Sequence, residues 1–238
     1  SNEEFYWNRD AINIKADVTD YKIMRNCMTD IDYVFHLAAE SRLQPAIENP
    51  IEAIVKNCVG TTTVLQCARE AGVKKVMYSS TSSGYGMNSY PNVETQPDDC
   101  LNPYSASKVA AEKFCKMYTD LYGLKTVVFR YFNVYGERSP VFGQYAPVIG
   151  IFLKQKNEGQ PLTIVGDGSQ RRDFIHVKDV AAANILAATA DIPEEYYGQV
   201  FNIGSSDSIS IQEIANLISD DQVYIPKREG EMETTFAN

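Results

Sequence analysis

One segment organises the interpretation of this chain: Asn102-Pro103-Tyr104-Ser105-Ala106-Ser107-Lys108-Val109-Ala110-Ala111-Glu112. The proline suits the first turn of a helix, and the small residues allow that helix to pack closely against its neighbours. Tyr104 and Lys108 are four residues apart and therefore share one helix face. A phenol beside an ammonium can transfer protons, but a surface helix can carry the same pair by chance. Other motifs in the sequence are needed to choose between a proton-transfer site and a chance surface pair.

A second informative segment precedes that helix. Residues 75–86 read Lys-Val-Met-Tyr-Ser-Ser-Thr-Ser-Ser-Gly-Tyr-Gly, an apolar run that ends in a cluster of hydroxyls. This pattern predicts a buried strand that stops in a loop at Thr81, although a solvated turn has a similar composition. Ligands of open parallel sheets bind beyond the carboxyl ends of the strands, so the hydroxyl cluster is a candidate substrate site.

Proton transfer by Tyr104 has a physical requirement. A free tyrosine has a pKa of about 10, far above neutral pH. A nearby ammonium stabilises the phenolate and so lowers the pKa of a tyrosine. We therefore expect Lys108 to lower the pKa of Tyr104.

Elsewhere the sequence alternates between strand and helix patterns. The predicted strands cover residues 11–17, 32–39, the run from 76, 124–133 and 200–203, and the predicted helices cover 18–28, 50–71, 104–122, 147–157, 178–189 and 211–219. Such alternation predicts an α/β fold with a Rossmann-like, doubly wound parallel sheet that helices cover on both faces. Gly/Pro-rich segments between 135 and 167 predict excursions into a smaller α/β lobe.

The composition limits the possible partners. The chain has 238 residues, 44% of them hydrophobic, and a net charge of −9 with a pI near 4.8. An acidic protein offers no basic surface for a polyanion, so nucleic-acid binding is disfavoured. No apolar run is long enough to cross a bilayer, which predicts no membrane partner. Five cysteines without C-x-x-C spacing and two histidines predict reduced thiols, a cytoplasmic location and no metal site.

An ordered set of motifs runs through almost the whole sequence. They are Asp17-Val18, His36-Leu37-Ala38-Ala39, Ser79-Ser80-Thr81, Tyr104/Lys108, Arg130-Tyr131-Phe132-Asn133, Gly166-Asp167-Gly168, Arg172 to Val177 and Arg228-Glu229-Gly230-Glu231. In this order they resemble the motifs of extended short-chain dehydrogenase/reductases of the NAD-dependent nucleotide-sugar epimerase/dehydratase family, and within it the UDP-hexose 4-epimerases most of all. The resemblance implies NAD as cofactor and a UDP-sugar as substrate.

The chain departs from this family at both ends. Family members begin with a strand and a G-x-x-G-x-x-G turn whose backbone amides hold the pyrophosphate of NAD, and this sequence contains no such turn. The chain also stops at Asn238, before the family's final helices. We therefore expect a fragment of a longer protein, which as given would not bind NAD tightly.

The resemblance assigns a set of residues to the cofactor. The positions matched to NAD are Asp17, Val18, Leu37, Ala38, Ala39, Asn57, Ser79, Tyr104, Lys108 and Tyr131. Of these, Asp17 and Val18 would contact adenine, and Lys108 would bind the nicotinamide ribose. Residues 37–39 would line the pyrophosphate and that ribose.

A second set of residues is matched to the nucleotide sugar. These positions are Thr81, Asn133, Thr163, Val165, Arg172, Arg228, Glu231 and Thr235. Asn133 and the two arginines would meet the diphosphate, because the planar fork of arginine bonds two phosphate oxygens at once. Glu231 would meet the uridine ribose. The alternative for both arginines is a solvated surface charge.

The resemblance implies the catalytic residues Thr81, Tyr104 and Lys108. Tyr104 would take the proton of the sugar C4 hydroxyl through Thr81, and a 4-keto sugar would turn over before reduction on its other face. Dehydratases of the same family carry Asp-Glu after the threonine, where this chain has Ser82 and Ser83, which are poor acids and bases. A 4,6-dehydratase or decarboxylase, or a non-catalytic sugar-nucleotide binding module, remains the alternative.

The resemblance also implies an organisation. Residues 1–135 would form the NAD-binding domain, to which 170–204 return, and residues 136–169 and 205–238 would form the substrate lobe. The apolar helices 50–71 and 104–122 would make a four-helix interface in a homodimer, although a thick internal core has the same pattern. Thr235 matches a position that faces the sugar C2 substituent, and its small size would admit an N-acetyl group.

Overall fold

A four-stranded parallel sheet forms the centre of the larger part of the molecule, with strand order β1-β2-β3-β8. Its strands are β1 Tyr33–His36, β2 Lys75–Thr81, β3 Thr126–Tyr131 and β8 Val200–Ile203. In this computed structural model, which describes residues 8–139, 147–226 and 234–237, all three pairings in this sheet are parallel. The predicted α/β fold with a parallel sheet is confirmed.

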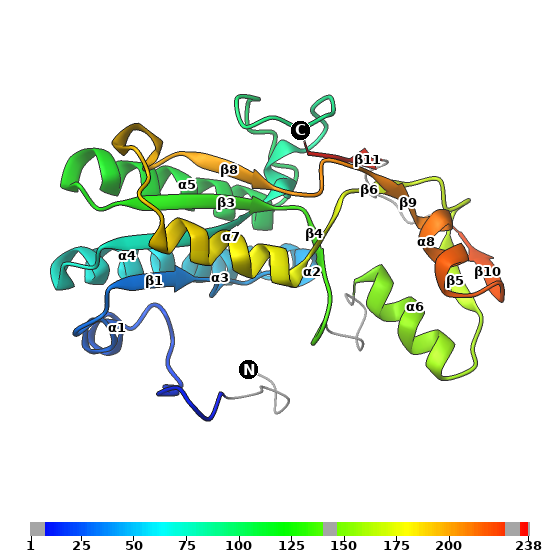
Figure 1. The fold of residues 1–238 in the computed structure, drawn as a ribbon, viewed down its shortest axis with the longest axis horizontal. Helices are drawn as coiled ribbons and strands as arrows, with labels where there is room; N and C mark the ends of the chain where they lie inside the picture. Colours follow the sequence, from blue (N-terminus) through cyan, green and yellow to red (C-terminus); the bar gives the residue numbers. More distant parts are fainter. Residues whose placement is uncertain (1–7, 140–146, 227–233, 238) are drawn as a thin grey trace.

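Helices cover both faces of this sheet, as Figure 1 shows. One face carries α3 Pro50–Ile54, α4 Gly60–Ala71 and α5 Pro103–Tyr122, with α1 Tyr21–Cys27 and α2 Leu43–Glu48 nearby, and the other face carries α7 Val177–Thr189. The side chains of β2 alternate between the two faces: Val76 and Tyr78 belong to the core with α4 and α5, whereas Met77 packs with Ala187 and Ala188 of α7. This strand is therefore buried on both sides, as its sequence predicts.

The long helix predicted over residues 50–71 is confirmed, but it is not uniform. Asn49 caps its start by accepting a hydrogen bond from the Glu52 N–H, and Gly72 ends it in the left-handed conformation, with φ at 70°. Between α3 and α4, residues Val55–Val59 form a π-helical turn. Such turns insert an extra residue into a helix and are frequent at functional sites. Asn57, in the middle of this turn, has a fully buried side chain.

A smaller group of elements follows the carboxyl ends of the sheet, beginning with β4 directly after β3 (Figure 1). It contains β4 Asn133–Tyr135, α6 Val148–Asn157, β5 Leu162–Val165, β6 Arg171–Arg172, β7 Phe174–His176, β9 Ile209–Ser210, α8 Ile211–Ile218, β10 Gln222–Ile225 and β11 Thr234–Thr235. Phe152, Leu162 and Ile214 form the core of this group. The domain boundaries given by the sequence stay a prediction.

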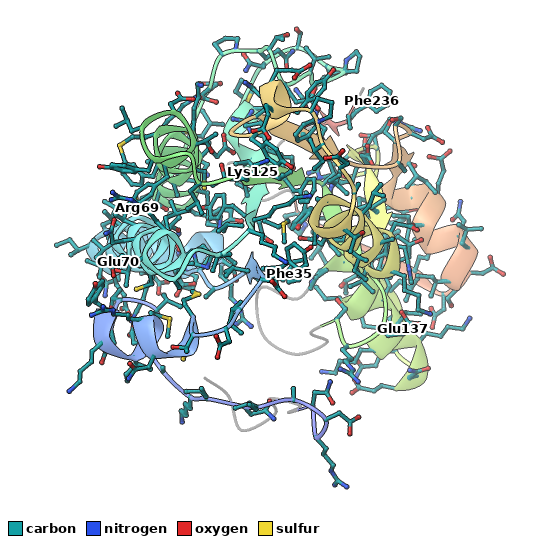
Figure 2. All side chains as sticks on the ribbon, turned by 60° about the vertical axis from the view of Figure 1, so that its left-hand side comes forward. Phe35, Arg69, Glu70, Lys125, Glu137 and Phe236 are labelled. Carbon is teal, nitrogen blue, oxygen red and sulfur yellow. The ribbon has the colours of Figure 1, made fainter. Side chains whose placement is uncertain are left out.

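One predicted element is wrong. Residues 11–17 form no strand within the described chain, and Ile12 and Ile14 are 93% and 55% exposed. Alternation of apolar and polar residues is not enough, because a strand also needs a neighbour for its N–H and C=O groups. Among the described strands β1 pairs with β2 alone and forms the edge of the sheet. Phe35 on this edge is 44% exposed, and Figure 2 shows it between the helical region of Arg69 and the segment of Glu137.

Candidate functional site

The candidate site begins where β2 ends, at Thr81. The chain turns there into a short 3-10 helix, Ser82–Tyr85. The Thr81 hydroxyl accepts a hydrogen bond from the Ser83 N–H at 3.1 Å and donates one to the Ser83 hydroxyl at 3.1 Å. This capping bond fixes the side chain of Thr81, which is buried at the carboxyl end of the sheet.

Helix α5 brings Tyr104 to the same place. Asn102 caps this helix by accepting a hydrogen bond from the Ser105 N–H at 2.9 Å, and Pro103 occupies its first turn. Burial raises the pKa of Tyr104, and a hydrogen bond with the Thr81 side chain opposes that rise. The structure therefore brings the predicted phenol close enough to the predicted hydroxyl for Thr81 to affect the pKa of Tyr104.

Lys108 lies one turn further along α5 and is 3% exposed. Its ammonium sits over the ring of Tyr78, 4.3 Å from the ring centre, and no hydrogen-bond acceptor contacts it within the described residues. Burial lowers the pKa of Lys108 to about 8. The expectation that Lys108 lowers the pKa of Tyr104 is wrong for this structure, because the ammonium faces Tyr78 and burial dominates at the phenol.

The surroundings of Lys108 fit a ribose, as the implied cofactor NAD requires. A buried ammonium without an acceptor is costly unless a ligand supplies one, and a ribose diol supplies two. Leu37 and Ala38, which follow β1, are exposed, and Ala39 is half-buried. The residues matched to the nicotinamide ribose thus offer it a hydrogen-bond donor, the Lys108 ammonium, and an accessible loop at residues 37–39.

Asn57 connects this loop to helix α5 through hydrogen bonds. Its side-chain oxygen accepts a hydrogen bond from the Glu40 N–H at 2.7 Å. Its amide nitrogen donates to the Glu40 carbonyl at 3.1 Å and to the Ser107 hydroxyl at 2.9 Å. The amide is therefore engaged by the protein itself, and it positions the chain after Ala39 against the residue that precedes Lys108.

The other residues matched to NAD lie in two places. Ser79, on β2, donates a hydrogen bond to the Tyr131 hydroxyl at 3.1 Å, next to Thr81. Asp17 accepts hydrogen bonds from the Thr19 N–H and hydroxyl and pairs with Lys56 of the π turn. The hydrogen bond with Lys56 holds the pKa of Asp17 at about 2.

Val18 lies against the start of α4. A Cβ added at Gly60 would come within 2.7 Å of the Val18 side chain, so glycine allows residues 17–18 to approach this helix. Asp17 and Val18 are therefore held together beside the π turn and the beginning of α4.

A cavity of about 480 Å³ gathers four of the residues matched to the nucleotide sugar. They are Asn133, Thr163, Val165 and Arg172, and they line it together with apolar side chains of α6. Gln155 holds Thr163 through two hydrogen bonds, at 2.8 Å to its hydroxyl and at 3.1 Å from its N–H. Asn133 donates to the Asp173 carbonyl at 2.7 Å.

The remaining substrate positions are only partly covered by the structure. Arg228 and Glu231 lie outside the described residues. Thr235 is described through its backbone, which pairs in parallel with Arg172. This register brings the chain at Thr235 beside the cavity.

A buried ionic cluster, not predicted from the sequence, lies between β3 and α5. Arg130 of β3 binds the Glu112 carboxylate through Nε at 2.9 Å and a terminal nitrogen at 2.7 Å, and Asp98 at 2.7 Å. Ser80 donates to Glu112 at 2.5 Å. Two signals were available: a charged residue inside the apolar strand 126–131, and an acid one helical turn after Lys108.

The described residues contain neither a metal-ligand cluster nor a membrane-spanning helix. No three His, Cys, Asp or Glu side chains gather as metal ligands in the part that the structure describes. None of the described helices has the length and apolar character of a membrane span.

Comparisons with known proteins agree on one family. The sequence matches the model of the NAD dependent epimerase/dehydratase family over residues 1–204. A UDP-N-acetyl-alpha-D-glucosaminuronate decarboxylase of Bacillus cytotoxicus is 38% identical, over 85% of this chain and 63% of its own length. A UDP-glucose 4-epimerase of Mycolicibacterium smegmatis is 33% identical, over 92% of this chain and 71% of its own length.

The comparison of structures points the same way. The UDP-N-acetylglucosamine 4-epimerase from Methanobrevibacter ruminantium, solved in complex with UDP-N-acetylmuramic acid, is 34% identical and superposes with a TM-score of 0.89. The match covers 94% of this chain and 73% of that one. The chain thus spans less than three quarters of the length of each of these three proteins.

Proposed function

The chain belongs to the NAD dependent epimerase/dehydratase family, and within it we propose that the full-length protein interconverts the C4 epimers of a UDP-sugar through a transient 4-keto intermediate. What supports this proposal is the position of Thr81 at the end of β2 near Tyr104, which lies one turn of α5 before the buried ammonium of Lys108. NAD is the cofactor, and when bound it supplies the hydride acceptor and donor. Proton transfer and substrate binding are left to the chain itself.

Thr81 and Tyr104 move the proton in this proposal. The Thr81 hydroxyl has one proton and two lone pairs, so it can accept the C4 hydroxyl proton while passing its own to the Tyr104 oxygen. Lys108, with a pKa of about 8, is mainly charged at pH 7. In this structure the ammonium faces Tyr78, so the Thr81 hydroxyl is the group that counteracts the effect of burial on the pKa of Tyr104.

The cavity between β4, β5 and α6 would receive the nucleotide. Arg172 and Asn133 in its wall would meet the diphosphate, and Thr163 and Val165 would lie against the uridine. Arg228, Glu231 and Thr235 would complete the same site. Asp17 and Val18 would contact adenine at the other end of the cofactor, with residues 37–39, Asn57, Ser79 and Tyr131 along its length.

Replacing Tyr104 by Phe tests the proposal. Turnover of UDP-glucose to UDP-galactose should fall about 10²- to 10⁴-fold, because general acid–base groups contribute on this order, while UDP-sugar affinity changes little. Tyr118→Phe is the matched control, since Tyr118 lies on the same helix and its hydroxyl contacts Gln66 instead. Near-normal turnover in Tyr104→Phe would contradict the mechanism.

Product analysis separates the alternatives. The 38% identity to a UDP-N-acetyl-glucosaminuronate decarboxylase favours decarboxylation as the second candidate. Ser82 and Ser83 beside Thr81 disfavour a dehydratase, because a hydroxyl at its usual pKa is a poor acid or base. Release of CO₂ from a UDP-uronate, or a 4-keto-6-deoxy product from UDP-glucose, would replace epimerisation as the function. Binding of UDP-sugars without any turnover would identify a binding module.

We also propose that the protein accepts UDP-N-acetylhexosamines as well as UDP-hexoses. The small side chain of Thr235 and the likeness to a UDP-N-acetylglucosamine 4-epimerase support this proposal. Thr235→Tyr should lower kcat/KM for UDP-N-acetylglucosamine about tenfold or more relative to UDP-glucose, because a bulky residue excludes the acetamido group. An unchanged ratio of the two constants would show that Thr235 is not the gate.

The oligomer we propose is a homodimer through the helices 50–71 and 104–122. Large apolar side chains are exposed on both helices, including Ile51 at 75% and Leu121 at 68%. A second copy of the same surface would bury them by two-fold symmetry. Leu121→Glu should shift the protein to a monomer in sedimentation experiments, and a wild-type monomer at micromolar concentration would remove the proposal.

A further inference from the structure

An asparagine of α7 has no part in the roles described above, although it is almost fully buried. Asn184 is 8% exposed and stands alone as a polar residue in Ala181-Ala182-Ala183-Asn184-Ile185-Leu186. Its amide nitrogen donates to the Tyr131 hydroxyl at 2.7 Å and to the Val180 carbonyl at 2.8 Å. A carbonyl only accepts, so Val180 fixes which end of the amide is the nitrogen. Tyr131 is therefore an acceptor on its α7 side.

The hydrogen bonds of this group can be counted. Tyr131 and Ser79 have one hydroxyl proton each, and the 3.1 Å bond between them uses one of the two. Tyr131 does not donate its proton to Asn184, because the amide nitrogen is the donor in the hydrogen bond between them. One O–H donor is left over, and none of the described residues accepts it. The chain of Ser79, Tyr131 and Asn184 thus presents one spare donor.

The spare donor lies beside the reacting groups. Ser79 precedes Thr81 by two residues and so points to the same face of β2. Tyr131 pairs directly with Thr81 in the parallel register of β2 and β3. A ligand that contacts Thr81 would therefore lie next to this donor.

Asn184 also destabilises the fold through one of its side-chain atoms. Its side-chain oxygen is buried and has no partner within the described chain. An unsatisfied buried acceptor destabilises a fold, and a leucine of similar volume would not carry this penalty. The amide is therefore best explained by its donors, and above all by the bond to Tyr131.

We propose that Asn184 is a positioning residue for the nicotinamide end of NAD: it holds the Tyr131 hydroxyl as an acceptor on the helix side, so that the spare donor is directed to the carboxamide carbonyl of the ring. The carboxamide is the hydrogen-bonding group of that ring, and the ring has to lie next to the sugar carbon. The adenine end is bound elsewhere, near Asp17. The inference rests on the cofactor of the family and not on the sugar chemistry.

The test compares two ligands that share the adenine end. NAD carries the carboxamide, whereas ADP-ribose lacks the whole nicotinamide ring. In the full-length protein, Asn184→Leu should weaken the affinity for NAD about three- to tenfold, as expected for one lost hydrogen bond, and leave the affinity for ADP-ribose within about twofold. Titration calorimetry measures both dissociation constants without any turnover.

Two further variants keep the test decisive. Tyr131→Phe removes one oxygen and should give the same selective loss, so it carries the test if Asn184→Leu does not fold. Thr189→Val is the matched control, because the Thr189 hydroxyl bonds only its own helix, at the Ile185 carbonyl. Equal weakening of NAD and ADP-ribose would indicate a structural role and overturn the proposal, and so would unchanged affinity for NAD in both variants. A wild type that binds NAD but does not epimerise would refute the proposed function alone.

Discussion

Arg130 and Lys108 are both buried cations packed against α5, yet their surroundings are opposite. Arg130 has the carboxylates of Glu112 and Asp98 at 2.7 Å. Lys108 has the ring of Tyr78 and no acceptor within the described residues. Burial alone would lower the pKa of either group, but Glu112, Tyr85 and Asp98 together outweigh it and raise the pKa of Arg130. For Lys108 burial prevails, and its pKa falls to about 8.

This difference separates scaffold from site. The charge of Arg130 is neutralised by the fold, so it ties β3, α5 and the segment of Asp98 together, although its Nη1 is buried without a partner among the described residues. The charge of Lys108 is held at a cost that the fold itself does not offset. A buried cation without an acceptor is therefore the better indicator of a binding site than a buried ion pair.

The largest effect is expected for Arg130→Met. This change leaves the Glu112 carboxylate, which is 2% exposed, without its counter-ion, and the free energy of unfolding should fall by about 3–5 kcal/mol. Lys116→Met is the control, because its exposed pair with Asp120 should be worth only about 0.3–0.5 kcal/mol. Urea unfolding of both variants measures the difference. A loss below about 1 kcal/mol for Arg130→Met would show that Arg130, like Lys108, is not stabilised by its surroundings.

Lys108→Met should instead increase the free energy of unfolding. The lowered pKa means that the charged side chain costs roughly 3 kcal/mol at neutral pH, so the variant should gain about 1–3 kcal/mol of stability while turnover is lost. Between pH 8 and 9.5 the unfolded wild type binds more protons at Lys108 than the folded protein does. Wild-type stability should therefore rise with pH relative to the variant, by up to about 1.4 kcal/mol per pH unit.

Urea midpoints across this pH range provide the measurement. A destabilisation of Lys108→Met as large as that of Arg130→Met would show that the ammonium is paired after all, and the contrast between the two cations would fail. A parallel pH dependence of wild type and variant would contradict the lowered pKa.

The third prediction concerns His36, whose ring is buried and senses the charge of this lysine. Burial, followed by the charge of Lys108, lowers the pKa of His36 to about 3. The unfolded chain therefore binds the extra proton between about pH 6 and 4, and stability should fall on acidification by up to about 1.4 kcal/mol per pH unit. His36→Gln keeps an N–H for the Thr61 hydroxyl, 2.9 Å from the ring nitrogen, and should show a shallower fall.

Acid titration of both proteins by circular dichroism checks this. Equal slopes for wild type and His36→Gln would mean that the histidine is protonated in the fold. In the Lys108→Met variant, which keeps His36, stability should fall slightly less steeply on acidification than in the wild type. One of the two causes of the lowered pKa of His36 is then removed.

Local sequence patterns predict the helix and the strand that hold the proposed catalytic residues. The caps Asn102 and Gly123 bound the helix of Tyr104 and Lys108, and four-residue spacing puts both on one face. The apolar run before Thr81 predicted a strand that ends in hydroxyls, and the repeated alternation predicted the parallel sheet. These features depend on neighbouring residues, which is why periodicity and capping reveal them without a structure.

Which groups are paired and which are not depends on contacts between segments that are remote in the sequence. The bonds of Arg130 with Glu112 and Asp98, the hold of Asn184 on Tyr131 and the pairing of β10 with β5 join segments far apart in the chain. Residues 11–17 also depend on a remote segment: they have the alternating pattern of a strand but no neighbouring strand with which to pair in the described chain. Burial and partner choice set the sign of each pKa change, and both arise only when remote segments meet, so the spacing of Tyr104 and Lys108 could not show that the ammonium faces Tyr78.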